Sequence, residues 1–176
     1  MNILIQILSS VGFITAIIGV IYLLISIGKK MLYYPANVQQ EALKKISKSF
    51  QIAGILIAIS TICFLGGKQI IKFDFYYTLK HNKMINTEID GIFFSENDLN
   101  GVFNNFEGTE GRNRCEHFRG FINLENNETI PIEIIRHCYE KNRYIIISKK
   151  YYMDADIGDI VTDKFDYIQK ETINSQ

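Results

Sequence analysis

Charged side chains are missing from two long apolar runs in the first part of the chain. The first run covers residues 3–27 and contains no Asp, Glu, Lys or Arg. A helix of this length, with a rise of about 1.5 Å per residue, spans a hydrocarbon layer about 30 Å thick. The second run, 50–67, is shorter and is followed directly by Lys68. Because no Gly or Pro interrupts the chain just before it, the pattern predicts membrane-spanning helices over 3–27 and 38–67.

A cleaved signal peptide and a buried helix of a soluble protein are the alternatives for these runs. A signal peptide carries basic residues ahead of about 7 to 15 apolar residues, whereas the first run is longer and has no basic residue before it. If both uncharged runs were buried helices of a soluble protein, they would need a larger hydrophobic core than a chain of 176 residues supplies. We therefore expect a transmembrane hairpin over residues 1–71.

The charges between and after the two runs predict the topology. The linker 28–49 holds five lysines against one carboxylate: Lys29, Lys30, Lys44, Lys45, Lys48 and Glu41. Short Lys-rich loops stay in the cytoplasm. Four lysines after the second run oppose this orientation: Lys68, Lys72, Lys80 and Lys83. We expect the linker inside and the C-terminal domain outside the cytoplasm. The frequent Ile, Asn and Lys indicate a bacterial inner membrane.

Small residues on the first helix predict close packing with a second helix. The stripe follows spacings of three and four, is interrupted only by Leu23, and consists of Ser9, Gly12, Ala16, Gly19 and Ser26. The second helix offers Gly54 and Ala58. In lipid, helices associate through close packing rather than through the hydrophobic effect. We expect the two helices to pack on each other, with a homo-oligomer or docking on another membrane subunit as alternatives.

The hydrophobic period changes to two after Ile71. Phe73, Phe75, Tyr77 and Leu79 alternate with other residues over 73–79, as in a half-buried strand. Further strands are predicted over 88–95, 118–124, 129–138, 143–152 and 160–168. Turn-forming residues at 125–128 and 139–142 predict hairpins. The predicted fold class is an α+β membrane protein, with a small antiparallel sheet or barrel-like domain over 72–170 and a tail over 171–176.

An Asn- and Gly-rich stretch over 96–116 separates two of the predicted strands. We expect it to form a short helix or strand over 99–106, followed by a loop. Long loops in compact domains are often functional. The candidate binding residues are its polar and basic side chains: Asp98, Asn104, Asn105, Arg112 and Arg114.

Cys115 and Cys138 are the two cysteines outside the apolar runs. We expect free, buried thiols, and a disulfide in an oxidising compartment is the alternative. With His117 and His137 they raise the question of a zinc site, because thiolate and imidazole are the usual ligands. Their spacing argues against it, since adjacent residues of a regular strand point to opposite faces. The sequence therefore predicts no metal and no other cofactor.

Several function classes have no support in the sequence. It contains no nucleophile elbow, phosphate-binding glycine loop or zinc-protease motif. A net charge of zero without a basic tract gives no reason to expect nucleic acid as a partner. We expect a non-enzymatic binding or accessory protein, of the form of an immunity or exclusion protein, whose β domain binds another membrane or envelope protein. The alternatives are a metal-dependent enzyme or sensor using Cys115, His117 and His137, and a structural subunit of a membrane complex.

Overall fold

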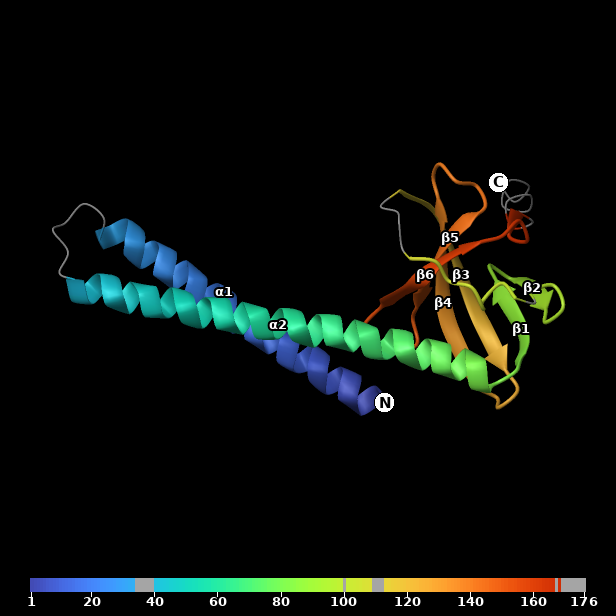
Figure 1. Ribbon diagram of the computed structural model, residues 1–176, viewed down its shortest axis with the longest axis horizontal. Helices are drawn as coiled ribbons and strands as arrows, with labels where there is room; N and C mark the ends of the chain where they lie inside the picture. The colour runs from blue at the N-terminus through green and yellow to red at the C-terminus, as the bar shows by residue number, and fades with distance from the viewer. Residues whose placement is uncertain (34–39, 100, 109–112, 167, 169–176) are drawn as a thin grey trace. The chain divides into compact units, whose positions relative to one another are not determined.

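The computed structural model describes residues 1–33, 40–99, 101–108, 113–166 and 168, and within them it has two helices and six strands (Figure 1). Their bounds are α1 Asn2–Tyr33, α2 Gln40–His81, β1 Met84–Ile89, β2 Ile92–Ser95, β3 Arg114–Leu124, β4 Thr129–His137, β5 Arg143–Ser148 and β6 Ala155–Val161. The chain divides into two compact units at Gly67 and Lys68. The fold is α+β, with two long apolar helices followed by an antiparallel sheet.

In the first unit, each helix buries one residue in every seven. The buried positions are Ile5, Gly12, Gly19 and Ser26 of α1, and Ile46, Ala53, Ser60 and Gly67 of α2. A period of seven keeps one side of each helix against its neighbour. Gly12 and Gly19 permit a close approach. A Cβ atom on Gly12 would lie 3.2 Å from the Cβ of Cys63, and one on Gly19 would lie 3.1 Å from Cγ1 of Ile57.

The predicted partners on α2 are wrong, because they lie on a different side of the helix from the residues that contact α1. Gly54 and Ala58 are both exposed, and a Cβ atom on Gly54 would meet nothing within 4 Å. The contact with α1 runs through Ala53 and Ser60 instead. Adjacent residues differ by about 100° around a helix, so Gly54 points well away from the side that Ala53 occupies. On α1, Ser9 and Ala16 are half-buried next to the buried positions.

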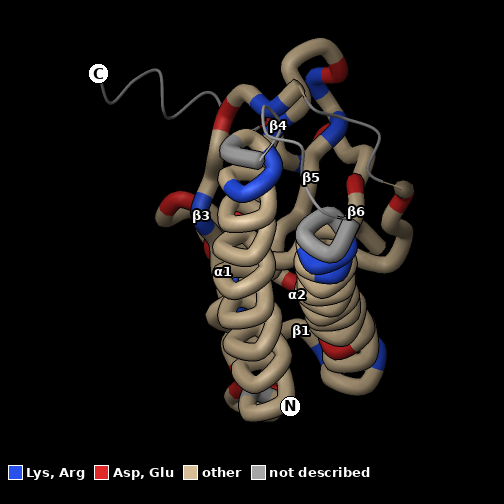
Figure 2. Tube along the Cα trace, turned by 90° about the vertical axis from the view of Figure 1, so that its left-hand side faces the viewer, with Lys and Arg blue, Asp and Glu red and all other residues tan. Residues whose placement is uncertain are grey.

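Large apolar side chains cover the outer surfaces of both helices. Ile3 is 73% exposed, Phe13 62% and Ile62 69%. In Figure 2 the trace of α1 carries the colour of basic residues only near one end. The sequence places Lys29 and Lys30 near the C-terminal end of this helix. By length and composition, both helices are long and apolar enough to cross a membrane. A water-soluble hairpin has the reverse arrangement, with its large apolar side chains in the shared contact.

The second unit contains an open, six-stranded sheet in the order β2-β1-β3-β4-β5-β6, and all neighbours are antiparallel. The barrel-like alternative is wrong, because β2 and β6 form opposite edges of the sheet. Short connections join most consecutive strands. The chain between β2 and β3 is longer and returns from the edge to the far side of β1.

The strand predicted over 73–79 is wrong, because α2 continues to His81. Within this stretch Phe75 is buried and Phe73 and Tyr77 are exposed, which is a helical period. Apolar residues occupy so many positions here that both periods fit the sequence. Extending an existing helix avoids the cost of nucleating a new element, and it places Phe75 in the core of the second unit.

The strand predicted over 88–95 is two strands joined by a hairpin turn at Asp90 and Gly91. Their φ angles are 48° and 85°, the left-handed values that a two-residue hairpin of this type requires. An Asp-Gly pair is a strong hairpin signal, and the sequence interpretation passed over it. The last strand is also misplaced, since β6 lies before most of 160–168.

One face of the sheet carries the main hydrophobic core. The end of α2 contributes Phe75, and the connection between β2 and β3 contributes Leu99 and Phe103. This connection forms turns rather than the expected short helix or strand. It reaches the far edge of the sheet, where Glu107 and Asp159 exchange main-chain hydrogen bonds of 2.8 and 3.2 Å. A smaller apolar cluster consists of Ile135, Ile145 and Ile147.

Candidate functional site

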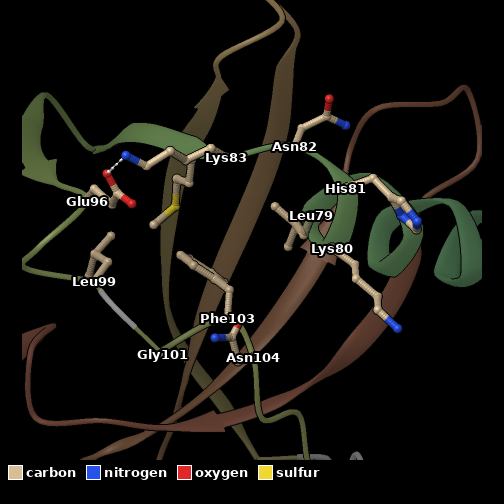
Figure 3. A pocket seen from close by; sticks show the side chains of 11 residues that line it. Leu79, Lys80, His81, Asn82, Lys83, Glu96, Leu99, Gly101, Phe103 and Asn104 are labelled. Carbon is tan, nitrogen blue, oxygen red and sulfur yellow. Dashed lines mark ion pairs between the residues drawn. The ribbon is translucent and has the colours of Figure 1, made fainter.

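A pocket with a volume of about 350 Å³ lies where α2 ends and β1 begins. The connection between β2 and β3 forms its other wall. Leu79, Leu99 and Phe103 point into the pocket, whereas Lys80 and His81 point away from it (Figure 3). The lining is therefore mixed, with apolar side chains on part of the wall and polar groups on the larger part of the surface.

Side chains at the end of α2 fix the shape of this pocket. The main-chain N–H of Asn82 and its side-chain Nδ2 both donate to the carbonyl oxygen of Thr78, each at 3.0 Å. Nδ1 of His81 donates to the carbonyl oxygen of Tyr77 at 2.8 Å. These bonds satisfy carbonyl groups that a helix end leaves without partners. The helix therefore stops at a defined residue and directs the chain along the pocket wall.

An ion pair and an amide group form the polar rim. Nζ of Lys83 lies 3.0 Å from the carboxylate of Glu96, and its hydrogen bond to Glu96 raises the pKa of Lys83. Asn104 adds an exposed amide from the opposite wall. Binding pockets have volumes from about 300 Å³ upward and combine apolar side chains with polar groups that fix orientation. The arrangement suits one or two side chains of a partner protein, or a small amphipathic ligand.

The other candidate binding residues between β2 and β3 do not line the pocket within the described part of the chain. Asp98 accepts hydrogen bonds from Oγ and the main-chain N–H of Ser95, at 2.6 and 2.9 Å, which lower the pKa of Asp98 and close a turn. Asn105 is exposed beside Asn104 and does not line the pocket. Arg114 lies 3.1 Å from Asp156 in an ion pair. Arg112 lies outside the described residues.

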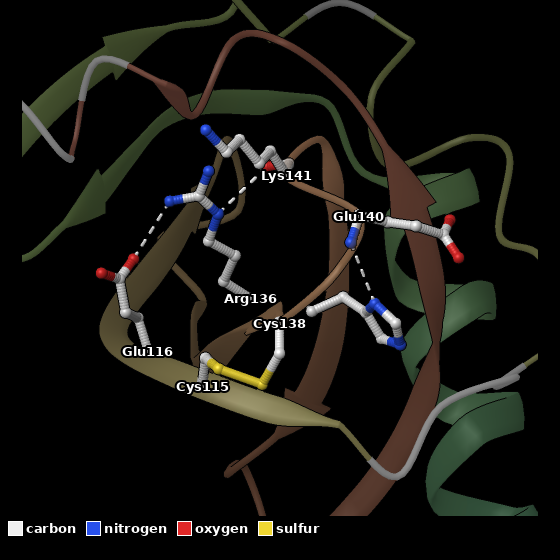
Figure 4. Close-up of a disulfide and its surroundings, with 7 residues drawn as sticks. Cys115, Glu116, Arg136, Cys138, Glu140 and Lys141 are labelled. Carbon is white, nitrogen blue, oxygen red and sulfur yellow. Dashed lines mark hydrogen bonds and ion pairs between the residues drawn. A yellow bond between two sulfur atoms is a disulfide. The ribbon is translucent and has the colours of Figure 1, made fainter.

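Cys115 and Cys138 form a disulfide that joins the start of β3 to the residue after β4 (Figure 4). Their Cα atoms are 5.1 Å apart, and the N–H of Cys138 donates to the carbonyl oxygen of Asn113 at 3.0 Å. Both cysteines are exposed and bonded to each other, so the structure differs from the expected free, buried thiols and has the alternative disulfide. The bond holds the end of the long connection against the neighbouring strand.

The residues considered as metal ligands have other partners. Nδ1 of His117 lies 2.7 Å from the Glu133 carboxylate, and Nδ1 of His137 accepts the N–H of Glu140 at 3.2 Å. Cys115 has no thiolate to offer while it is in the disulfide. Among the residues with described positions, no three His, Cys, Asp or Glu side chains are grouped so as to hold a metal ion.

A largely buried cluster of charged and polar side chains was not predicted from the sequence. Nζ of Lys150 lies 2.9 Å from Asp74 and 2.5 Å from Glu128, and the hydroxyl of Tyr151 donates to Asp74. Burial lowers the pKa of Lys150, but the hydrogen bonds to Asp74 and Glu128 outweigh burial and raise it well above its usual range. Burial and the bond to Asp74 raise the pKa of Tyr151 to about 12. Lys150 therefore stays protonated and Tyr151 stays neutral at neutral pH.

The chain matches no protein-family model, no curated protein and no solved structure. Any chemical role must therefore be argued from the side chains themselves. The pocket offers the apolar side chains of Leu79 and Phe103, the Lys83–Glu96 ion pair and the Asn104 amide, which together are suited to binding.

Proposed function

We propose that this protein is a membrane-anchored, non-enzymatic binding protein. In this account α1 and residues 50–67 of α2 cross the bilayer, and the β domain stands in water and binds another membrane or envelope protein. The observation that carries the proposal is the burial pattern of the helices, with small residues in their shared contact and large apolar residues outside. In water such a surface is costly, whereas in lipid it is the stable arrangement.

The topology follows from the charges and the cysteines. The Lys-rich linker favours a cytoplasmic position, which puts the β domain on the other side after one crossing by α2. The Cys115–Cys138 disulfide supports this orientation, because such bonds persist in oxidising compartments outside the cytoplasm. An immunity or exclusion protein of a bacterial inner membrane would have this form.

Thiol labelling tests the orientation. In a Cys63→Ser background, Cys115 and Cys138 are the remaining cysteines. A membrane-impermeant maleimide should label intact cells only after treatment with a reductant, because the thiols are paired and face outward. Labelling that requires permeabilised cells, with or without reductant, would contradict the outward placement.

The pocket at the end of α2 is the proposed contact point for the partner. A photoreactive amino acid at Asn104 should crosslink to a specific membrane protein, whereas the same amino acid at Asn105 should not. The two positions are adjacent and exposed, but only Asn104 lines the pocket. Equal crosslinking from both positions, or none from either, would count against the pocket as the binding site.

A further inference from the structure

We propose that the outer face of the sheet, over β2, β1 and β3, binds an arginine side chain of the partner protein. The site consists of Phe93, Glu88 and Phe121, and we call it the cation site. The inference rests on the proposed function in so far as the arginine belongs to that partner. The cation site is separate from the pocket at the end of α2, because none of its three residues lines that pocket.

The strand register brings the three side chains into one row across the sheet. Glu88 of β1 is directly opposite Phe93 of β2 and directly opposite Phe121 of β3. Residues directly opposite each other in an antiparallel pair point to the same face, with Cα atoms about 4.5 to 5.5 Å apart. The adjacent residues Ile89 and Ile122 belong to the core on the other face. The row therefore places a carboxylate between two aromatic side chains whose Cα atoms are about 10 Å apart.

Both aromatic rings of the cation site are exposed, although they belong to regular strands. Phe93 is 69% exposed and Phe121 44%. Within the residues that the structure describes, the two cation–ring contacts involve Tyr76 and Tyr151, so neither phenylalanine has a cation over its ring. Large apolar rings that lie close together on an exposed face are typical of an interaction surface.

The carboxylate between the rings has no counter-charge in the described part of the domain. Glu88 is partly buried, and it takes part in none of the ion pairs found there. By contrast Glu133, on the same face of the sheet, is paired with His117 and Lys149. A carboxylate that neighbouring rings partly shield from water is stabilised by a cation that binds to it. The cation site is therefore complementary to a positively charged group.

An arginine side chain suits both the rings and the carboxylate. Its guanidinium group is planar and weakly hydrated, stacks on aromatic faces and donates two parallel hydrogen bonds to a carboxylate. A cation above Glu88 can lie within about 6 Å of both rings, the distance at which aromatic faces attract positive charge. The ammonium group of lysine is more strongly hydrated and lacks the planar fork. The quaternary ammonium of a choline headgroup has no N–H to donate to Glu88.

Polar side chains border the cation site on the same face of the sheet. Asn86, Asn123 and Thr129 form a row in which Asn123 donates to Asn86 at 2.7 Å and accepts from Thr129 at 2.8 Å. Arg119 is exposed on the other side of the site, and among the described residues it forms no ion pair with Glu88. An apolar and charged centre with a polar rim is the usual composition of a protein–protein contact.

Tryptophan fluorescence tests the cation site, because the chain has no Trp of its own. Full-length Phe93→Trp protein in nanodiscs would be titrated with the peptide acetyl-Gly-Arg-Gly-amide. We expect a saturable change of emission, and adding Glu88→Gln should weaken peptide binding at least about tenfold. Asp163→Asn is the matched control, because it removes an exposed carboxylate elsewhere in the domain and should leave the affinity unchanged. The same peptide with glutamine in place of arginine should not change the emission.

Four results of this titration would overturn the proposal. Equal peptide affinity with and without Glu88→Gln would show that the carboxylate does not bind the arginine. Tighter binding of choline than of the arginine peptide would assign the site to a lipid headgroup. Emission that shifts with protein concentration before peptide is added would mean that a second copy of the chain covers the site. Stronger peptide binding after Arg119→Gln would mean that the chain's own Arg119 occupies it.

Crosslinking from Asn104 separates failure of this inference from failure of the proposed function. Glu88→Arg should lower the yield of the partner crosslink from Asn104, because it places two like charges together, whereas Asp163→Arg should not. An unchanged yield with Glu88→Arg would overturn the assignment of the arginine to the partner and leave the proposed function intact. Absence of any crosslink in the unmodified background would count against the proposed function, while the peptide titration still decides whether the cation site binds arginine.

Discussion

The Lys150 ammonium lies 2.9 Å from the Asp74 carboxylate, although 76 positions separate them in the sequence. Asp74 belongs to α2, and Lys150 follows β5. Because Asp74 is nearly buried, the loss of either partner would leave a charge poorly solvated. The ion pair therefore fixes the last turns of α2 to the sheet and makes them part of the β domain.

Asp74→Asn should lower the free energy of unfolding of the domain by about 3 kcal/mol, because Lys150 loses one of its two carboxylates in a largely buried site. Urea denaturation of the full-length protein in detergent measures this loss. The matched control is Asp163→Asn at an exposed position, which should change stability by less than about 0.5 kcal/mol. Equal effects of the two substitutions would contradict a stabilising role for the pair.

Glu133→Gln should lower stability by about 1 kcal/mol at neutral pH and have no effect in acid. The hydrogen bond from Lys149 lowers the pKa of Glu133, and His117 adds to this effect. A carboxyl group with a lowered native pKa stabilises the fold above its ordinary pKa of about 4.3, and this stabilisation is lost as the pH falls through the native value. Melting temperatures from pH 3 to pH 8 measure the difference from wild type. If the melting temperatures of Glu133→Gln and wild type still differ at the lowest pH, the effect does not come from the ionised carboxylate of Glu133.

Reduction of the Cys115–Cys138 bond should destabilise the β domain by about 3 kcal/mol, since the bond closes a loop with a sequence separation of 23 residues. Cys115→Ser with Cys138→Ser should reproduce the effect of reductant, and the double variant should no longer respond to reductant. Cys63→Ser is the control and should leave the response to reductant unchanged. If the denaturation curve of the wild-type protein is the same with and without reductant, the disulfide does not stabilise the domain.

Gly19→Leu should disrupt the pairing of α1 and α2, because a Cβ atom there would already lie 3.1 Å from Ile57 and 3.2 Å from Leu56. Overpacking of this kind costs about 1 to 3 kcal/mol. Gly54→Leu is the matched control, because a Cβ atom at Gly54 meets open space. Thermal denaturation in detergent compares them, and the helix contact described above requires that only Gly19→Leu lowers the melting temperature.

The two apolar helices could be predicted from the sequence because the absence of charge over a long run is a local property. The side of each helix that faces the other was harder to predict. On α1 the small residues form one stripe, and the structure buries Gly12 and Gly19 within it. On α2 both Ala53 and Gly54 are small, and only the register with α1 decides between them.

The β domain was predicted in class but not in detail. Alternating apolar residues marked four of the six strands within a few residues, but they also suggested a strand where α2 continues through Phe75. The local pattern of apolar residues could not distinguish a strand from a helix here, because burial of Phe75 depends on the sheet that packs on it. The Asp74–Lys150 ion pair could not be predicted for the same reason, since nothing near Asp74 in the sequence indicates its partner.

Alkaline carbonate extraction of membranes from cells that produce the full-length protein tests the central claim most directly. If α1 and α2 cross the bilayer, the protein should stay in the membrane pellet and enter solution only with detergent. Recovery of the folded full-length chain in the carbonate supernatant would contradict the account.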